Sequence, residues 1–227
     1  MRRSNGFCEG AESNQSPRNG GPRRAPDLCD SLRQRQQRVG PLASSSDFLP
    51  RALSRENQQP PVNDAVEPIR LLFVCMGNIC RSPTAEGVMR ALLREQGLTD
   101  RVEIDSAGTG DWHVGAPPDA RAAVAASSRG ITLEGAARVV VRADFDDFDL
   151  ILAADRRNLR ELRAAAPQGS RARLRLLREF DPASSGAPDL DVPDPYYGGD
   201  DGFEHVIDLI DAACRGLLEQ LRADGRL

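Results

Sequence analysis

The spacing of Cys75 and Arg81 is that of a short loop that can hold an oxyanion. An apolar run, residues 71–74, precedes Cys75 and is typical of a buried strand. Gly77 and Asn78 follow it, and both residue types tolerate unusual backbone angles. Backbone N–H groups of a tight loop converge on one point, and a guanidinium can bind two oxygens of a phosphate. A thiolate at Cys75 would then lie beneath the phosphate, in line for attack at phosphorus.

A helix is expected to begin directly after this loop. Ser82 is predicted as its N-cap, Pro83 as its first residue, and Glu86 as an acid in its first turn. The N-terminus of a helix carries partial positive charge, which favours a bound anion. The same field favours the thiolate form of Cys75. Strand, loop and helix therefore predict a phosphate site with a nucleophilic thiol.

These residues carry a family resemblance. The sequence Val-Cys-x4-Cys-Arg-Ser-Pro resembles the signature loop of the low-molecular-weight protein tyrosine phosphatases, and Asp194-Pro195-Tyr196-Tyr197 resembles their general-acid loop. The resemblance covers about residues 69–221. It implies that Cys75 forms a cysteinyl-phosphate, that Arg81 clamps the phosphate, and that Asp194 protonates the leaving phenolate and then activates water. It implies no metal and no other cofactor.

Further residues are expected to bind the phosphate or the substrate. They are Met76, Gly77, Asn78, Ile79, Cys80 and Ser82 in the loop, and Trp112, Tyr196 and Tyr197 as aromatic walls of the pocket. Asn78 can hold the strained loop through side-chain hydrogen bonds. Ser82 either stabilises the thiolate, serves as a plain N-cap, or does both, and Ser106 is a weaker candidate for the same network.

The remaining cysteines have less specific interpretations. Cys80 either packs as an apolar side chain or forms a disulfide with Cys75 that protects it from over-oxidation, and the resemblance favours the second. Cys8, Cys29 and Cys214 are interpreted as structural or incidental, because five cysteines in this chain form no disulfide-scaffold pattern.

Other ionisable residues are not assigned to the site. No metal-ligand spacing surrounds His113 or His205. The family often has a histidine directly before the residue that matches Gly130. This chain has Arg129 there, so any role of that histidine is in question here.

Strands alternate with helices over residues 68–227, which predicts an α/β fold. Strands are expected at 71–74, 102–106, 149–153 and 173–177, helices at 83–96, 118–128, 155–166 and 202–222, a short extended run at 138–141 and a helical turn at 142–147. The alternation predicts a parallel sheet with helices on both faces, and the resemblance implies four strands. Ligands of such sheets lie at the carboxyl ends of the strands, where Cys75 is placed. The loop at 181–201 is long enough to be functional.

Residues 1–67 differ in kind from the rest. Ser, Asn, Gln, Gly, Pro and Arg dominate there, and few apolar residues could offset the entropy of ordering. We interpret this segment as a disordered extension, or as a stretch that is not translated because the true start lies downstream. A targeting or partner-binding arm is the alternative.

Composition narrows the function classes. A net charge of −4 gives no nucleic-acid footprint, and no apolar run is long enough to span a membrane. No apolar run follows residues 1–3, which argues against a secretory signal, so the expected location is the cytoplasm. The expected partners are phosphotyrosine-containing proteins, and the resemblance suggests a bacterial tyrosine kinase among them. A monomer or weak dimer is expected.

Three alternatives compete with a phosphotyrosine phosphatase. An arsenate reductase would relay oxidation through further cysteines, and none occurs between Arg81 and His205. Phosphoarginine phosphatases that resemble this loop carry threonine in place of Ile79 and lack the paired tyrosines. A non-catalytic phosphate-binding module would be expected to have lost Cys75 or Asp194.

Overall fold

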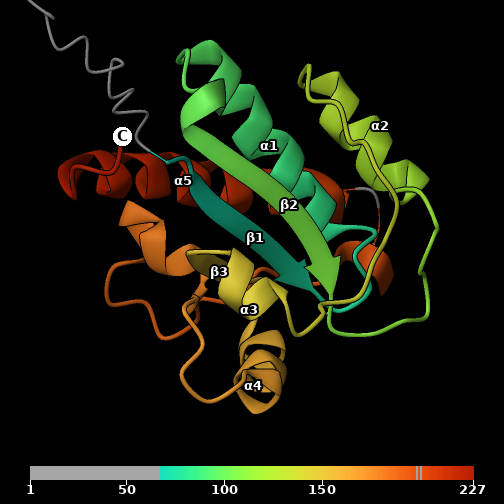
Figure 1. Ribbon diagram of the computed structural model, residues 1–227. Helices are drawn as coiled ribbons and strands as arrows, with labels where there is room; N and C mark the ends of the chain where they lie inside the picture. Colours follow the sequence, from blue (N-terminus) through green and yellow to red (C-terminus); the bar gives the residue numbers. More distant parts are fainter. Residues whose placement is uncertain (1–66, 198, 200) are drawn as a thin grey trace, which may run out of the picture. The chain divides into compact units, whose positions relative to one another are not determined.

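The computed structural model describes residues 67–197, 199 and 201–227 (Figure 1). The predicted extension at residues 1–67 lies outside the described residues, apart from Glu67. Within the described part of the chain, no helix is both long enough and apolar enough to cross a membrane.

The core of the fold is a four-stranded parallel sheet, as predicted, and its strand order is β2-β1-β3-β4. The strands are β1 (Ile69–Cys75), β2 (Val102–Gly108), β3 (Leu150–Ala153) and β4 (Arg173–Leu176). Cys75 pairs with Gly108, and Val74 pairs with Ala153, so the three strand ends lie at one edge. That edge is where the loop after β1 begins.

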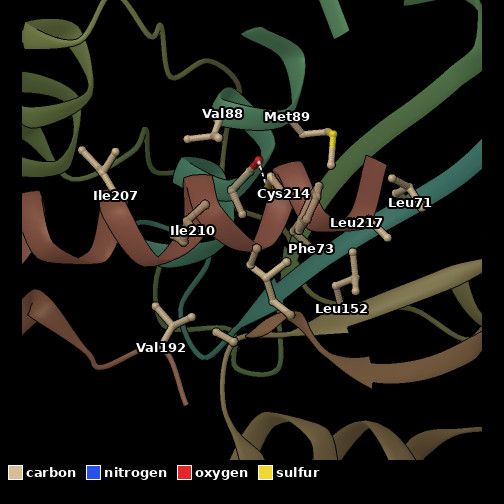
Figure 2. Packing of buried hydrophobic residues seen from close by; sticks show 14 of the residues in the cluster. Leu71, Phe73, Val88, Met89, Leu152, Val192, Ile207, Ile210, Cys214 and Leu217 are labelled. Carbon is tan, nitrogen blue, oxygen red and sulfur yellow. Dashed lines mark hydrogen bonds between the residues drawn. The ribbon is translucent and has the colours of Figure 1, made fainter. Parts of the chain in front are cut away.

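Helices cover both faces of the sheet (Figure 1). They are α1 (Arg81–Glu95), α2 (Ala120–Ser128), α3 (Asp144–Asp147), α4 (Arg156–Ala165) and α5 (Asp201–Ala223), with short 3₁₀ helices at Thr99–Arg101, Leu177–Phe180, Pro182–Ser184 and Pro195–Tyr197. Side chains alternate along β1, as the pleat of a strand requires. Leu71 and Phe73 pack with α1 and α5 in one cluster, shown in Figure 2, whereas Leu72 and Val74 pack with α3 and α4 in the other.

The start of α1 corrects one prediction. Cys80, rather than Ser82, is the N-cap residue, and Glu86 lies beyond the first turn. The carbonyl of Cys80 accepts hydrogen bonds from both the backbone N–H and the hydroxyl of Thr84, at 3.1 and 2.7 Å. The helix therefore begins one residue before Ser82, which leaves the Ser82 hydroxyl free to turn toward Cys75.

Candidate active site

The loop between β1 and α1 turns through a strained backbone position. Asn78 has a φ of 55°, and among the described residues it alone has a positive φ without being glycine. This conformation directs its backbone N–H to Cys75 Sγ, at 3.2 Å. Gly77 lets the loop approach His113 closely, since a Cβ there would lie 2.9 Å from His113 Cδ2 and the imidazole would have to shift. The loop thus brings a backbone donor back onto the sulfur of its first residue.

Cys75 is buried at the base of the loop, at the carboxyl end of β1. Its Sγ lies 3.1 Å from Ser82 Oγ. The Ser82 hydroxyl also lies 3.2 Å from the carbonyl oxygen of Ala107, to which it can donate. Because a hydroxyl has a single hydrogen, it can donate to the sulfur or to the carbonyl, but not fully to both. A negative charge on the sulfur would favour the hydrogen bond from the Ser82 hydroxyl to Cys75 Sγ.

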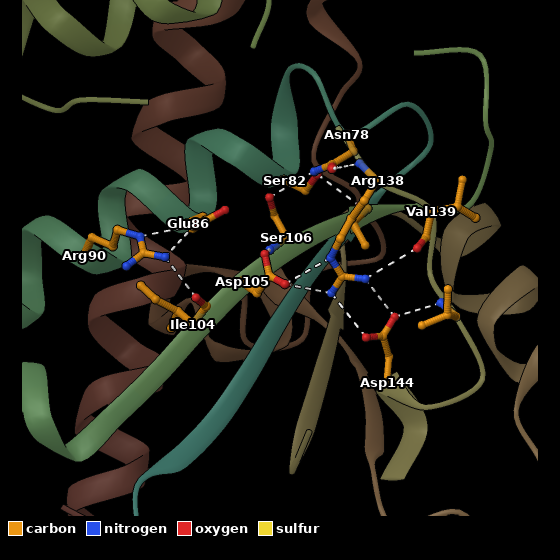
Figure 3. Close-up of polar contacts among 12 residues, drawn as sticks. Asn78, Ser82, Glu86, Arg90, Ile104, Asp105, Ser106, Arg138, Val139 and Asp144 are labelled. Carbon is orange, nitrogen blue, oxygen red and sulfur yellow. Dashed lines mark hydrogen bonds and ion pairs between the residues drawn. The ribbon is translucent and has the colours of Figure 1, made fainter. Parts of the chain in front are cut away.

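The side chain of Asn78 connects this sulfur environment to the end of β2 (Figure 3). Its amide nitrogen donates to Ser82 Oγ and to Ser106 Oγ, each at 2.9 Å. Its amide oxygen accepts a hydrogen bond of 2.9 Å from the backbone N–H of Arg138. Both amide hydrogens and the oxygen are therefore used, which fixes the orientation of the group.

Arg81 is almost completely buried, and acidic side chains surround its guanidinium. Nη1 donates to Asp155 Oδ2 at 2.7 Å and to the carbonyl oxygen of Val192 at 3.0 Å. Nη2 donates to Asp194 Oδ2 at 3.1 Å. Burial acts to lower the pKa of Arg81, but the charges of Cys75 and Asp194 and the hydrogen bond to Asp155 raise it above its usual value. The guanidinium is therefore a fixed positive charge beside the sulfur.

Asp155 is a site residue that our sequence analysis did not single out. Its Oδ2 accepts from Arg81, while its Oδ1 accepts the backbone N–H of Asn158 and caps α4, at 2.7 Å. The available signal was its place just after a buried strand, at the edge where ligands bind.

Asp194 lies beside the loop although it is 113 residues from Arg81 in sequence. Its Oδ1 accepts the backbone N–H of Tyr196 at 3.2 Å, so the turn at residues 194–197 holds the carboxylate. About a third of the side chain is exposed, which leaves it accessible from outside the loop. The structure therefore brings the predicted nucleophile, clamp and general acid together.

Aromatic side chains form a rim on the outer side of the loop. Trp112 and Tyr197 are largely exposed, and Tyr196 is about 38% exposed. The rings of Tyr196 and Tyr197 meet edge to face, with centroids 5.1 Å apart. His113, which the sequence analysis left unassigned, lies against Gly77 and has its ring 6.2 Å from that of Tyr196. Its imidazole thus lies between the loop and the tyrosines.

Backbone hydrogen bonds set the position of the segment that carries Trp112. The N–H of Thr109 donates to the carbonyl of Cys75, and the N–H of Gly110 to that of Met76, both at 2.9 Å. The indole ring covers Gly110, where a Cβ would lie 1.7 Å from a ring carbon. The segment therefore follows the loop closely.

The N-terminus of α2 contacts both loops of the site. The backbone N–H of Asp119 donates to the carbonyl of Ile79 at 2.8 Å. Arg121 donates to the carbonyl of Tyr196 at 3.2 Å and places its guanidinium carbon 5.3 Å from the Tyr196 ring centroid. No sequence signal indicated this link, because it depends on the approach of segments far apart in the chain.

Cys80 and Arg129, both discussed from the sequence, lie in different surroundings. Cys80 is a buried free thiol, and burial, aided by the charge of Asp119, raises its pKa to about 12. Arg129 forms ion pairs with Glu204 and Asp208 of α5, at 2.7 and 2.5 Å. Arg129 thus joins α2 to α5 rather than contributing to the loop.

The parallel sheet, the loop after β1, the buried thiol and arginine, and the carboxylate of Asp194 define a site for a tetrahedral oxyanion next to a nucleophile. The family model described as low molecular weight phosphotyrosine protein phosphatase matches residues 70–227. The chain belongs to this family.

Curated relatives and solved structures agree with this assignment. A low molecular weight protein-tyrosine-phosphatase of Streptomyces coelicolor is 50% identical over 154 residues, which cover 67% of this chain and 93% of the relative. The crystal structure of an Entamoeba histolytica protein tyrosine phosphatase superposes with a TM-score of 0.64 at 40% identity, covering 70% of this chain and 99% of that one. A Drosophila arginine phosphatase also superposes, with a TM-score of 0.64 at 32% identity, covering 69% and 99% of the two chains.

Proposed function

We propose that this protein is a metal-independent protein-tyrosine-phosphatase that works through a cysteinyl-phosphate intermediate. One observation carries the proposal. Cys75 Sγ lies within reach of the Asn78 N–H and the Ser82 hydroxyl, in a loop whose exit residue, Arg81, contacts Asp194. Nucleophile, anion clamp and proton donor are thus within one cluster of side chains.

The loop and the start of α1 bind the phosphate group. Backbone N–H groups of Met76, Gly77, Ile79 and Cys80 supply donors, and the helix N-terminus adds partial positive charge. Arg81 binds two phosphate oxygens with its planar guanidinium. Because these donors are already oriented, little reorganisation is needed when charge moves onto the equatorial oxygens in the transition state.

The reaction proceeds in two displacements. Cys75 Sγ attacks phosphorus, the S–P bond forms as the P–O bond to the tyrosine breaks, and the leaving phenolate takes the proton of Asp194. The Asp194 carboxylate then takes a proton from water, which attacks phosphorus and releases inorganic phosphate. The S–P bond electrons return to Cys75, and the Asn78 N–H and the Ser82 hydroxyl stabilise the thiolate.

The aromatic rim supports a phosphorylated ring as the substrate. Trp112, Tyr196 and Tyr197 present faces and edges against which a phenyl ring can pack. Ile79 contributes a buried apolar side chain to the loop, a surrounding that suits a phenyl ring better than a charged guanidino group. Phosphoarginine is the competing substrate because a similar solved structure is of an arginine phosphatase.

Five less direct expectations accompany this function. Cys80 forms a disulfide with oxidised Cys75 and so protects it from further oxidation. The substrates are phosphotyrosine-containing proteins, a bacterial tyrosine kinase among them, and the chain acts in the cytoplasm as a monomer or weak dimer. An unusual N-terminal segment, residues 1–67, precedes the phosphatase domain at 68–227.

Hydrolysis of p-nitrophenyl phosphate in the presence of EDTA tests the proposed function. We expect the wild type to be active, Cys75→Ser to be inactive and Arg129→Lys, which alters an ion pair away from the loop, to retain activity. Peptides carrying phosphotyrosine or phosphoarginine then compare the two substrates, with phosphotyrosine expected to be preferred. A folded wild type without turnover, or activity that survives in Cys75→Ser, would refute the proposal.

A further inference from the structure

The geometry around the Cys75 sulfur depends on Asn78 in two ways. Its backbone N–H reaches Sγ directly, and its side chain donates to Ser82, whose hydroxyl lies 3.1 Å from the same sulfur. The residue also holds a left-handed backbone conformation, which costs energy in any residue with a Cβ. Some other part of the structure therefore has to keep Asn78 in place.

Apolar packing does not supply that support on one flank of the loop. A cavity of about 300 Å³ lies there, and its walls include Asn78, Asp105, Ser106 and residues 134–137. The side chain of Asn78 borders this space rather than a layer of close-packed carbon atoms. Hydrogen bonds to Asn78 therefore have to fix its position here.

Arg138 provides one of these hydrogen bonds through its backbone. Its N–H donates to Asn78 Oδ1 at 2.9 Å, and its carbonyl accepts the N–H of Gly108 at 2.8 Å. The same residue thus joins the loop to the end of β2. Its N–H also selects the orientation of the Asn78 amide, because a flipped amide would direct an NH₂ group at this N–H and an oxygen at Ser82 and Ser106.

The guanidinium of Arg138 binds two carboxylates, those of Asp105 and Asp144, and so anchors the backbone of Arg138 (Figure 3). It donates to Asp144 at 2.9 and 3.2 Å and to Asp105 at 3.0 Å. Each carboxylate also accepts a backbone N–H, Asp105 that of Ser106 at 2.7 Å and Asp144 that of Val141 at 2.8 Å. One partly exposed ionic cluster, in which only Asp144 is buried, therefore fixes β2 at Ser106 and the chain on either side of Val139.

We propose that Arg138 is a positioning residue for the phosphatase reaction, which fixes the Asn78 amide and through it the donors that face the Cys75 thiolate. The proposal rests on the proposed function. Arg138 reaches the site through its hydrogen bond to Asn78 Oδ1, so it acts through Asn78. Weakening its anchor lets the amide of Asn78 turn, and the Ser82 hydroxyl then loses the partner that directs it to the sulfur.

The test variant is Arg138→Lys, which keeps a positive charge but cannot bridge two carboxylates with a planar fork. Arg129→Lys is its matched control, since Arg129 also pairs with two carboxylates, Glu204 and Asp208, at a distance from the loop. Both variants leave Arg81 and Asp194, the charged groups near Cys75, unchanged. Asp105→Asn weakens the same anchor with a smaller change in shape and serves if Arg138→Lys does not fold.

Two readouts separate positioning from general destabilisation. The first is the pH midpoint for inactivation by iodoacetate, which follows the thiolate fraction of Cys75 and needs no turnover. The second is kcat and KM for p-nitrophenyl phosphate. We expect Arg138→Lys to raise the midpoint by about one pH unit and to lower kcat about tenfold while KM changes less than about twofold. We expect Arg129→Lys to change neither.

An unchanged midpoint and kcat in both Arg138→Lys and Asp105→Asn would overturn the proposal while wild-type turnover still supports the phosphatase function. Equal changes in Arg138→Lys and Arg129→Lys would also overturn it, because they would indicate a loss of stability alone. A folded wild type without turnover would refute the function instead, and the iodoacetate profile would still decide whether Arg138 controls the thiolate.

Discussion

Arg81 Nη2 lies 3.1 Å from Asp194 Oδ2, so the proposed phosphate clamp and the proposed general acid are in direct contact. The contact joins the first residue of α1 to the turn at residues 194–197. A second carboxylate, that of Asp155, holds the other terminal nitrogen of the same guanidinium at 2.7 Å. Arg81 is therefore oriented by two acids with different roles, which can be separated by mutation.

Replacing Asp194 by alanine should impair leaving-group protonation. We expect kcat to fall by about 10²–10⁴-fold for phenyl phosphate, whose leaving group needs a proton. The loss should be smaller for p-nitrophenyl phosphate, whose leaving group is a weaker base. Steady-state kinetics with both substrates measure the difference, and an equal loss for the two would argue against a general-acid role.

Replacing Asp155 by asparagine should weaken the orientation of Arg81 without removing the cap of α4, because asparagine caps helices about as well as aspartate. Loss of a charge-assisted hydrogen bond predicts a fall in kcat/KM of about 10-fold or more, with little change in the melting temperature. Asp155→Ala is the comparison, since it removes the cap as well and should also lower the melting temperature. If Asp155→Asn kept wild-type kcat/KM, its contact with Arg81 would have no catalytic importance.

Oxidation should distinguish Cys80 from Cys214, which is also buried. Peroxide converts the Cys75 thiolate to a sulfenic acid, and attack by Cys80 forms the disulfide with loss of water. We expect dithiothreitol to restore more activity to the peroxide-treated wild type than to Cys80→Ser. Cys214→Ser is the control because Cys214 is completely buried against α1 and should recover like the wild type. Equal recovery in all three proteins would remove the protective role from Cys80.

The raised pKa values of two buried thiols, Cys80 and Cys214, predict that the protein loses stability at high pH. Burial raises the pKa of Cys80 to about 12 and that of Cys214 still further, from ordinary values of 9.0. Above about pH 9 the unfolded chain therefore binds fewer protons than the folded chain, so the free energy of unfolding decreases as pH rises.

Thermal unfolding between about pH 8 and pH 11 measures this effect. We expect the melting temperature to fall with pH, by about 2–4 °C for each kcal/mol lost in a domain of this size. In Cys214→Ala the slope should be shallower, since one of the two groups is gone. If the melting temperature of Cys214→Ala fell with pH as steeply as that of the wild type, Cys214 would not contribute to the loss of stability at high pH.

The strand order along the chain and the nucleophile loop were predictable because their signals are local. Apolar runs marked β1 and β3, and the residues from Cys75 to Pro83 carried both the loop and the family resemblance. The predicted N-cap of α1, Ser82, was wrong by two residues, because Cys80 is the N-cap. Serine is a residue type that often occupies the N-cap position. In this structure Cys80 is the N-cap, and the Ser82 hydroxyl lies against the sulfur of Cys75 instead.

The supporting contacts of the site were not predictable, because they join distant segments. Asp155 was visible only as a helix start, and its second oxygen reaches Arg81 from across the sheet edge. Arg138 acts through a backbone N–H, a group that every residue except proline carries, so its identity gives no signal for this contact. Arg121 reaches the carbonyl of Tyr196 only because α2 begins beside the general-acid loop.

Trapping the phosphorylated enzyme tests the central claim most directly. Asp194→Asn should slow hydrolysis of the intermediate, so rapid quenching after mixing with p-nitrophenyl phosphate, followed by peptide mass spectrometry, should find one phosphoryl group on Cys75. Cys75→Ser with Asp194→Asn provides the control and should carry no phosphoryl group in that peptide. Phosphate bound to Cys75 supports nucleophilic catalysis by this thiolate. Turnover with no phosphoryl group on Cys75, or with the group on another residue, would contradict it.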